Sequence, residues 1–386
     1  MAQRLIIAGG GLSGVLTALA FAERPDVDVT LLEAGPTLGG DHTWSFYATD
    51  VDTVGARLIA PFVAHSWDGY DVVFRGLKRR LPTPYRTVTS ARLDDVARAR
   101  LGGKVRFSCP VAALDDRSAT LGDGTRLEAD AVIDARGPSE LVGAVLRWQK
   151  FLGREVRLAA PHGLTRPTIM DATVEQLDGY RFVYLLPYSA DTLLIEDTYY
   201  AEDRGLDRAT LRARIDLYAA SRGWTIIGDV REETGVLPLL LGGDFSAIWS
   251  HAAPDGGAAP IGVRAALFHP VTSYSLPHAV QTAVALATLA GPLSTDRVRA
   301  TVRTLAAQHF ARSGFDRLLN RLLFLAGRPD ERHGVLERFH RLPQPLIERF
   351  YAGRMSRAQQ ARVLIGKPPV PILGALRALP QSAAAH

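Results

Sequence analysis

Residues 5–33, LIIAGGGLSGVLTALAFAERPDVDVTLLE, have the clearest structural pattern in the chain. Its apolar start predicts a short buried strand over residues 4–8, followed by a tight turn from Gly9 to Gly14. A helix is expected over residues 12–23 and a second strand over residues 27–32, which ends at Glu33. Strand, glycine turn, helix, strand and acid in this order form the fingerprint of a dinucleotide-binding domain.

Each glycine of this turn has a physical role. Gly9 allows the tight turn, Gly11 lets the backbone approach a pyrophosphate, and Gly14 lets the helix sit close to the strand. The N-terminus of the helix then points toward the phosphates. Glu33 follows Gly14 by 19 residues, which is the spacing for an acid that accepts hydrogen bonds from ribose hydroxyls.

Two later segments favour FAD over NAD as the dinucleotide. Residues 129–137, ADAVIDARG, predict an apolar strand that returns the chain to the nucleotide domain. Residues 261–279 form a turn-rich loop that opens into the helical pattern PHAVQTAVALATLA. The N-terminus of that helix would stabilise an anionic reduced flavin. Each segment alone also fits an ordinary core strand or helix, and their order along the chain favours the flavoprotein.

Composition sets further limits. A chain of 386 residues predicts two or three lobes. The single cysteine, Cys109, excludes an internal disulfide framework, and no Cys and His cluster has metal-site spacing, so we expect no metal and a cytoplasmic setting. The sequence has no run of about 18 apolar residues that would span a bilayer. It also lacks the GxSxG, P-loop and HExxH motifs.

The basic charge is concentrated in the last quarter of the chain. From residue 291 on there are 16 Lys and Arg but 6 Asp and Glu, whereas the rest holds 29 and 34. Such asymmetry favours an anionic lipid or nucleic-acid surface, or else an arginine-rich solvated helical face. Apolar residues at helical spacing within 315–326 and 335–350 fit either a membrane interface or packing on a core. No nucleic-acid module is recognisable, so nucleic acid is not an expected partner.

The candidate acid lies in a predicted hairpin. RFVYLLPYS (181–189) and TLLIEDTYY (192–200) are rich in strand-forming residues and flank a short turn. Glu196 and Asp197 interrupt the second strand, and alternation points them to opposite faces. Burial raises a carboxyl pKa and can keep the acid protonated as a general acid. The alternative is a buried carboxylate paired with an arginine such as Arg181.

Aromatic residues crowd the segment GGDHTWSFY, residues 39–47. The paired glycines suit a close approach to a cofactor. Trp44, Phe46 and Tyr47 offer ring faces that could hold an apolar substrate or a developing cation. Simple packing between domains would explain these aromatics equally well.

Several longer segments together carry a family resemblance. They are GGDHTWSFY, IMDATVEQLDGYRFVYLLPYS, LLIEDTYY, GVRAALFHPVTSYSLP, LNRLLFLAG and RFYAG. With these the chain resembles the bacterial lycopene β-cyclases of carotenoid biosynthesis, over residues 3 to about 377. The resemblance implies an α/β fold, with a Rossmann-like FAD-binding domain, an inserted antiparallel β-sheet substrate domain and a helical C-terminal region. We assign these to residues 1–60, 85–155 and 251–295, to residues 61–84 and 156–250, and to residues 296–386.

The resemblance also implies a reaction. Such enzymes convert lycopene to γ-carotene and then β-carotene by a non-redox cyclisation that needs reduced FAD, with NAD(P)H as an indirect reductant. Glu196 takes the place of their acid–base residue. Lycopene resides in membranes, so the expected location is the cytoplasmic side of the inner membrane, as a peripheral protein. The oligomeric state stays open.

Site residues follow from the same resemblance and the motifs. Those expected at the FAD are Gly9, Gly11, Gly14, Glu33, Arg92, Gly262, Pro270, Thr272 and Ser273. Those expected to line the substrate and stabilise a cation are His42, Trp44, Phe46 and Tyr184. Two positions depart from the pattern: Asp41 replaces a usual Asn, and Ser273 a usual Gly, which affects the loop because serine resists positive φ.

The main alternative is a flavin-dependent oxidoreductase of the same architecture, such as a hydroxylase or a prenyl-chain reductase. It would use the flavin for hydride or oxygen chemistry and would not need Glu196.

Overall fold

A parallel sheet forms the nucleotide-binding half of the chain. In the computed structural model, which describes residues 2–177, 179–365 and 370–379, five strands pair in the order β18-β12-β1-β2-β8. Their bounds are β1 Gln3–Ala8, β2 Val27–Leu32, β8 Val105–Arg106, β12 Ala131–Asp134 and β18 Ala259–Pro260. All of these pairings are parallel. The two predicted strands and the returning strand within residues 129–137 are thereby confirmed.

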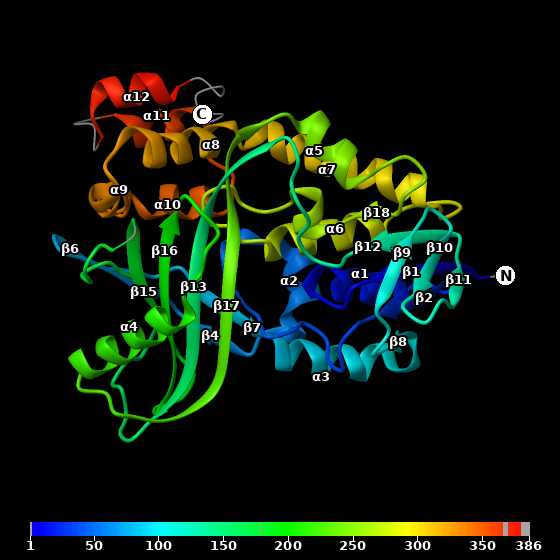
Figure 1. Cartoon of the computed structure of the whole chain (residues 1–386), viewed down its shortest axis with the longest axis horizontal. Coiled ribbons are helices and arrows are strands. Elements are labelled where there is room, and N and C mark those ends of the chain that lie inside the picture. The colour runs from blue at the N-terminus through cyan, green and yellow to red at the C-terminus, as the bar shows by residue number, and fades with distance from the viewer. Residues whose placement is uncertain (1, 178, 366–369, 380–386) are drawn as a thin grey trace.

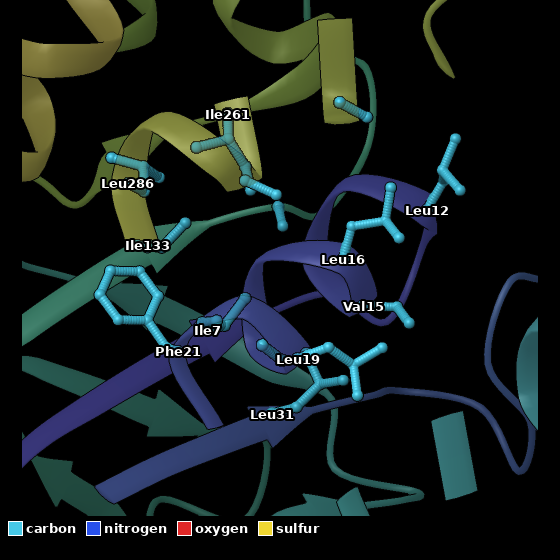
Figure 2. Close-up of a cluster of buried hydrophobic side chains, with 14 of the residues drawn as sticks. Ile7, Leu12, Val15, Leu16, Leu19, Phe21, Leu31, Ile133, Ile261 and Leu286 are labelled. Atoms are coloured by element: carbon cyan, nitrogen blue, oxygen red, sulfur yellow. The ribbon is translucent and has the colours of Figure 1, made fainter. Parts of the chain in front are cut away.

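Helices cover this sheet and bury its core. They are α1 Leu12–Ala22, α2 Thr53–Ile59, α3 Ser90–Leu101, α5 Phe245–Ala252, α6 Leu276–Ala287 and α7 Thr295–Arg312. Figure 2 shows the core where α1 meets the strands, with Ile7, Val15, Leu31 and Ile133 among the buried side chains. The apolar run of residues 5–33 therefore buries both faces of its strands, as parallel strands require.

Two small sheets flank this core. The first joins β9 Val111–Leu114, β10 Ser118–Leu121 and β11 Arg126–Glu128. The second has the order β3-β7-β4, with β3 Thr43–Tyr47, β4 His65–Trp67 and β7 Tyr85–Thr89. The aromatic segment 39–47 thus ends in a strand, in which neighbouring side chains point to opposite faces.

A seven-stranded sheet forms the other half. Its order is β17-β13-β16-β15-β14-β5-β6, and the pairing is antiparallel except between β14 and β5. The bounds are β5 Tyr70–Phe74, β6 Leu77–Leu81, β13 Ala144–Leu158, β14 Thr168–Asp171, β15 Tyr180–Pro187, β16 Thr192–Ala201 and β17 Ile226–Gly243. The predicted hairpin is confirmed as β15 and β16. Residues 144–155 pair in this sheet, although we grouped them with the nucleotide domain, so that boundary is corrected.

The two faces of the large sheet have different covers. Helix α4, Arg208–Ser221, packs on one face over Val183, Leu185 and Ile195. The opposite face packs against the C-terminal helices, which gather at one end of the molecule in Figure 1. These helices are α8 Gly314–Arg321, continued by a π-helical turn over Leu322–Ala326, α9 Arg332–Phe339, α10 Gln344–Tyr351 and α11 Arg357–Leu364. The last helix, α12 Ile372–Ala378, packs on the π-helical turn.

The amphipathic pattern of the C-terminal region has two outcomes. Within 335–350, Phe339, Ile347 and Phe350 are buried in the core of the large sheet, so packing and not lipid explains them. In α8 the buried face is polar instead: Asn320 Nδ2 donates to the Leu240 carbonyl, and Arg321 Nη1 donates to that of Leu241 at 2.7 Å. Within the described ranges, no helix is long and apolar enough to cross a membrane.

Candidate functional site

The glycine turn is shaped for a ligand that lies against the backbone. Gly9 has a φ of +106°, a conformation that favours glycine. A Cβ on Gly14 would lie 2.0 Å from the Gly9 carbonyl oxygen, so α1 approaches the turn as closely as a glycine permits. A Cβ on Gly11 would meet no atom within 4 Å, so this backbone faces open space. The turn therefore fits a pyrophosphate at the N-terminus of α1.

Glu33 stands at the end of β2 beside this turn. Its carboxylate accepts hydrogen bonds from the backbone N–H of Gly10 at 2.8 Å and of Gly35 at 2.7 Å. Two oxygens offer about four acceptor positions, so ribose hydroxyls can still bind here. The two backbone bonds fix the acid in place.

A second glycine approaches the same helix from the loop after β18. Gly262 has a φ of +65°, and a Cβ there would lie 2.6 Å from Ser13 Oγ in the first turn of α1. The preceding Ile261 N–H donates to the Asp134 carbonyl at 3.1 Å. Residues more than 240 positions apart thus meet at one helix N-terminus.

The loop between Gly262 and α6 is tied to the large sheet. The Pro270 carbonyl accepts from the Leu240 N–H at 3.1 Å and from Asn320 Nδ2 at 2.7 Å. Ser273 lies at a φ of +56°, which explains why glycine suits this position. Its hydroxyl donates to the Pro238 carbonyl, a local bond that helps to hold serine there. Thr272 Oγ1 accepts from the Tyr274 N–H at 3.3 Å.

Arg92 lies apart from these contacts. It is exposed near the start of α3, and its Nε donates to the Pro61 carbonyl at 3.0 Å. A role at the FAD stays a prediction for this residue.

The hairpin separates its two carboxyl groups as predicted. Asp197 is fully buried on the α4 side of the sheet, where Arg181 Nη2 donates to it at 2.5 Å and Arg181 Nε at 3.0 Å. The arginine-paired alternative therefore holds for Asp197. Glu196 points to the other face and accepts from the Thr198 hydroxyl at 2.5 Å.

The surroundings of Glu196 favour its protonated form. Burial raises the pKa of this carboxyl to about 8, and the nearby Glu233 carboxylate adds to the rise. The hydrogen bond from Thr198 acts in the opposite direction without cancelling them. A carboxylic acid that keeps its proton near neutral pH is suited to donate it.

Tyrosines surround this acid. Tyr184 on β15 pairs directly with Glu196 on β16, and its hydroxyl lies 2.7 Å from that of Tyr85. Tyr85 in turn lies 3.1 Å from the Tyr274 hydroxyl, which belongs to the loop before α6. The acid, the small sheet and the loop tied to the glycine turn therefore meet in one place.

The position of Phe46 on strand β3 corrects its predicted role. Phe46 is fully buried in the core of the nucleotide-binding half, so we withdraw it as a substrate contact. Trp44, half-buried, shares that face, and its ring meets the exposed His42 edge-on at 5.7 Å. The opposite face of β3 places Tyr47 against Tyr85. We call Tyr47, Tyr85, Tyr184 and Tyr274 the tyrosine cluster.

Sequence reasoning missed the residues that join the halves. Thr43 Oγ1 accepts from Arg231 Nη2 of β17 at 2.7 Å, and the Asp41 carbonyl accepts from Arg231 Nη1 at 2.7 Å. Strand alternation within 43–47 was the available signal for Thr43. For Arg231 there was none, because its partners lie about 190 residues away.

Known proteins match the chain over nearly its whole length. The family described as "Lycopene cyclase protein" matches residues 4–377. A lycopene beta-cyclase of Pseudescherichia vulneris is 47% identical over 97% of this chain and 96% of that protein. A lycopene beta-cyclase of Paracoccus sp. (strain N81106 / MBIC 01143) is 46% identical over 99% of this chain and 98% of that protein.

Solved structures share the fold at much lower identity. A flavin-dependent brominase aligns with a TM-score of 0.62 at 13% identity and covers 92% of this chain and 94% of its own. An oxygenase of 2-methyl-3-hydroxypyridine-5-carboxylic acid aligns with a TM-score of 0.58 at 18% identity and covers 84% and 93%. The predicted fold class, a Rossmann-like α/β domain with a β-sheet domain and C-terminal helices, is confirmed.

Proposed function

Because the chain belongs to the lycopene cyclase family, we propose that it cyclises the linear ends of lycopene, through γ-carotene, to β-carotene, with Glu196 as the acid and base. The observation that carries the proposal is the contrast within the hairpin. Asp197 is paired with an arginine, whereas Glu196 faces the tyrosine cluster with its pKa raised to about 8.

The chemistry requires such an acid. Glu196 transfers its proton to the terminal alkene of the linear end, and the resulting tertiary cation is attacked by the neighbouring double bond, which closes the ring. The Glu196 carboxylate then removes a ring proton, and this sets the β double bond. Proton gained and proton lost balance, so the product is an isomer of the substrate.

The tyrosine cluster contributes in two ways. Aromatic ring faces attract a nearby cation, and Tyr184 and Tyr274 lie where Glu196 releases its proton. Tyr184 is buried and Tyr274 is half-buried, and together they limit the access of water, which would otherwise hydrate the cation.

Residues of the glycine turn are suited to hold FAD. We assign the pyrophosphate to Gly9, Gly11 and the N-terminus of α1, and the ribose to Glu33. Gly262 completes the cradle from the other side. Bound and reduced, FAD supplies an electron-rich ring that stabilises positive charge, and NAD(P)H is the reductant we propose for it.

The acid–base assignment is tested with Glu196→Gln. The amide is similar in size but has no acidic proton, so we expect a loss of roughly 10³-fold or more in β-carotene formation under reduced-flavin conditions, in line with general acid–base catalysis. Glu155→Gln is the matched control, since Glu155 also lies on this sheet and pairs with Arg231. Unchanged conversion by Glu196→Gln would contradict the assignment. NAD(P)H consumption that matches product would instead indicate an oxidoreductase.

A lipid-soluble substrate calls for a membrane-docking surface, and we place it on α11 and α12. Ten large apolar residues of the described chain are exposed, and five of them lie here: Leu364, Ile365, Leu373, Leu376 and Leu379. Exposed arginines adjoin them at Arg357, Arg362 and Arg377. Apolar side chains beside cations fit an anionic lipid surface.

Vesicle binding tests this placement. We expect the double variant Leu373→Ser and Leu376→Ser to bind anionic vesicles at least tenfold more weakly while its fold and bound flavin stay intact. Leu217→Ser, an exposed leucine on α4, is the matched control. Equal binding by the two variants would rule out α12 as the docking element.

A further inference from the structure

Glu233, a buried carboxyl group, lies in the same row of the large sheet as Glu196. Gly153 on β13 pairs with Glu196 of β16 on one side and with Glu233 of β17 on the other. Residues that pair directly in a sheet share one face, so both glutamates rise on the side of the tyrosine cluster. Their backbones are about 10 Å apart, two strand spacings.

The missing side chain between them lets the two groups approach. A Cβ on Gly153 would lie 3.3 Å from Glu233 Cγ and 3.5 Å from Glu233 Oε1, so the Glu233 side chain leans over the glycine toward β16. It would also lie 3.4 Å from Leu194 Cδ1, which belongs to the strand of Glu196. A larger residue at this position would separate the two carboxyl groups.

Glu233 forms an ion pair with Arg231, whereas the same guanidinium acts on Glu196 only from a distance. Arg231 Nη1 donates to Glu233 at 2.9 Å, and the same guanidinium reaches Asp41 and Thr43 in the nucleotide-binding half. Glu233 is 5% exposed, and this burial raises the pKa of its carboxyl, whereas Arg231 acts in the opposite direction. When two carboxyl groups share a site, the one with the cation ionises first and the other keeps its proton.

We propose that Glu233 is a positioning residue for Glu196: it forms the ionised half of a carboxyl pair across Gly153, held by Arg231, and so keeps Glu196 in the proton-donating state. The proposal rests on the proposed role of Glu196 as the acid. The pair also favours the return step, because a Glu196 carboxylate beside Glu233 readily takes back a proton.

Other charged and titratable groups face this pair and belong in its pH behaviour. They are Glu155 from β13, Tyr184 and Tyr188 from β15 and its turn, Tyr274 from the loop before α6, His42 from the segment before β3, and Asp197 from the reverse face. Glu155 is the other carboxylate on Arg231, at 3.4 Å from Nε, and serves as the control.

The test is the pH profile of lycopene conversion by the full chain with reduced FAD in anionic vesicles. Activity should fall as pH rises through the pKa of Glu196. Glu233→Gln removes a negative charge, so it should move this fall to lower pH by about one unit. Arg231→Gln removes the cation that keeps Glu233 ionised, so Glu233 takes up a proton more readily and the fall should also move to lower pH. Glu155→Gln should move it less than Glu233→Gln.

A purely structural role predicts something else. Both Glu233→Gln and Arg231→Gln would then lower the rate at every pH without moving the fall, and that result would overturn the proposal. Glu233→Asp keeps the charge and should keep the fall in place. Glu196→Gln is measured alongside: if it retains activity, the acid assignment itself fails, whereas an inactive Glu196→Gln with an unmoved Glu233→Gln profile refutes only the pair.

Discussion

The glycine turn and the acid site of the large sheet are built in different ways. The glycine turn is built mainly from backbone atoms within residues 9–33, and Gly262 joins it from a distant part of the chain. The acid site brings together side chains from β3, β7, β13, β15, β16, β17 and the loop before α6. A binding site for a common cofactor can therefore be local, whereas a site for one particular reaction depends on packing between distant segments.

The largest expected effect concerns the turn. Gly14→Ala would place a methyl group 2.0 Å from a backbone oxygen, so we expect a destabilisation of about 3 kcal/mol and loss of bound flavin. Gly11→Ala meets no atom within 4 Å and should weaken flavin binding while the free energy of unfolding stays the same. Urea unfolding and flavin absorbance measure both. If Gly14→Ala and Gly11→Ala were equally stable, close packing of α1 would not be the reason for glycine at position 14.

The second comparison lies within the hairpin. Asp197→Asn leaves the buried Arg181 without its anion, and we expect it to lower the free energy of unfolding by about 3–5 kcal/mol. Glu196→Gln should not destabilise the chain but should abolish cyclisation. Chemical denaturation of both variants with product chromatography separates the two roles. The distinction would fail if Asp197→Asn were as stable as the parent protein.

Stability should also depend on pH through Glu196. Its folded pKa, about 8, exceeds the unfolded value of about 4.3, so the folded chain binds the extra proton between these values. This contribution to stability is complete below about pH 4 and is lost as pH rises toward 8. Glu196→Gln should therefore lose less stability than the parent between pH 5 and pH 8. Parallel urea titrations at these two pH values give the answer, and identical losses would contradict the raised pKa.

The smallest effect is expected at Ser273, which links the two regions. Ser273→Gly relieves the positive φ but gives up the hydrogen bond to Pro238, so the two changes should nearly cancel, within about 1 kcal/mol. Ser273→Ala keeps the strained backbone without the bond and should cost about 1 kcal/mol. Thermal unfolding ranks the variants. A more stable Ser273→Ala would show that the hydroxyl contributes nothing.

Sequence patterns predicted the fold better than they predicted the site. The strands and helix of residues 5–33, the returning strand and the hairpin were all located, because each has a periodicity or glycine signal of its own. Within the site, the roles of Glu196 and Tyr184 stay predictions, and Phe46 is withdrawn because residues 43–47 form a strand that turns it into the core. The apolar spacing within 315–326 gave no sign that Asn320 and Arg321 bond the carbonyls of β17.

By itself, the sequence determined the dinucleotide turn, the opposite facing of Glu196 and Asp197, and the family, because each of these depends on neighbouring residues and short-range geometry. Only the tertiary structure decided which carboxyl receives an arginine and which keeps its proton. The protonation state of each carboxyl depends on Arg181, Glu233 and Arg231, which lie on strands β15 and β17 and not on β16. These residues act on the two carboxyl groups electrostatically, and the strength of that interaction depends on distance in space. Separation along the sequence therefore does not reveal it.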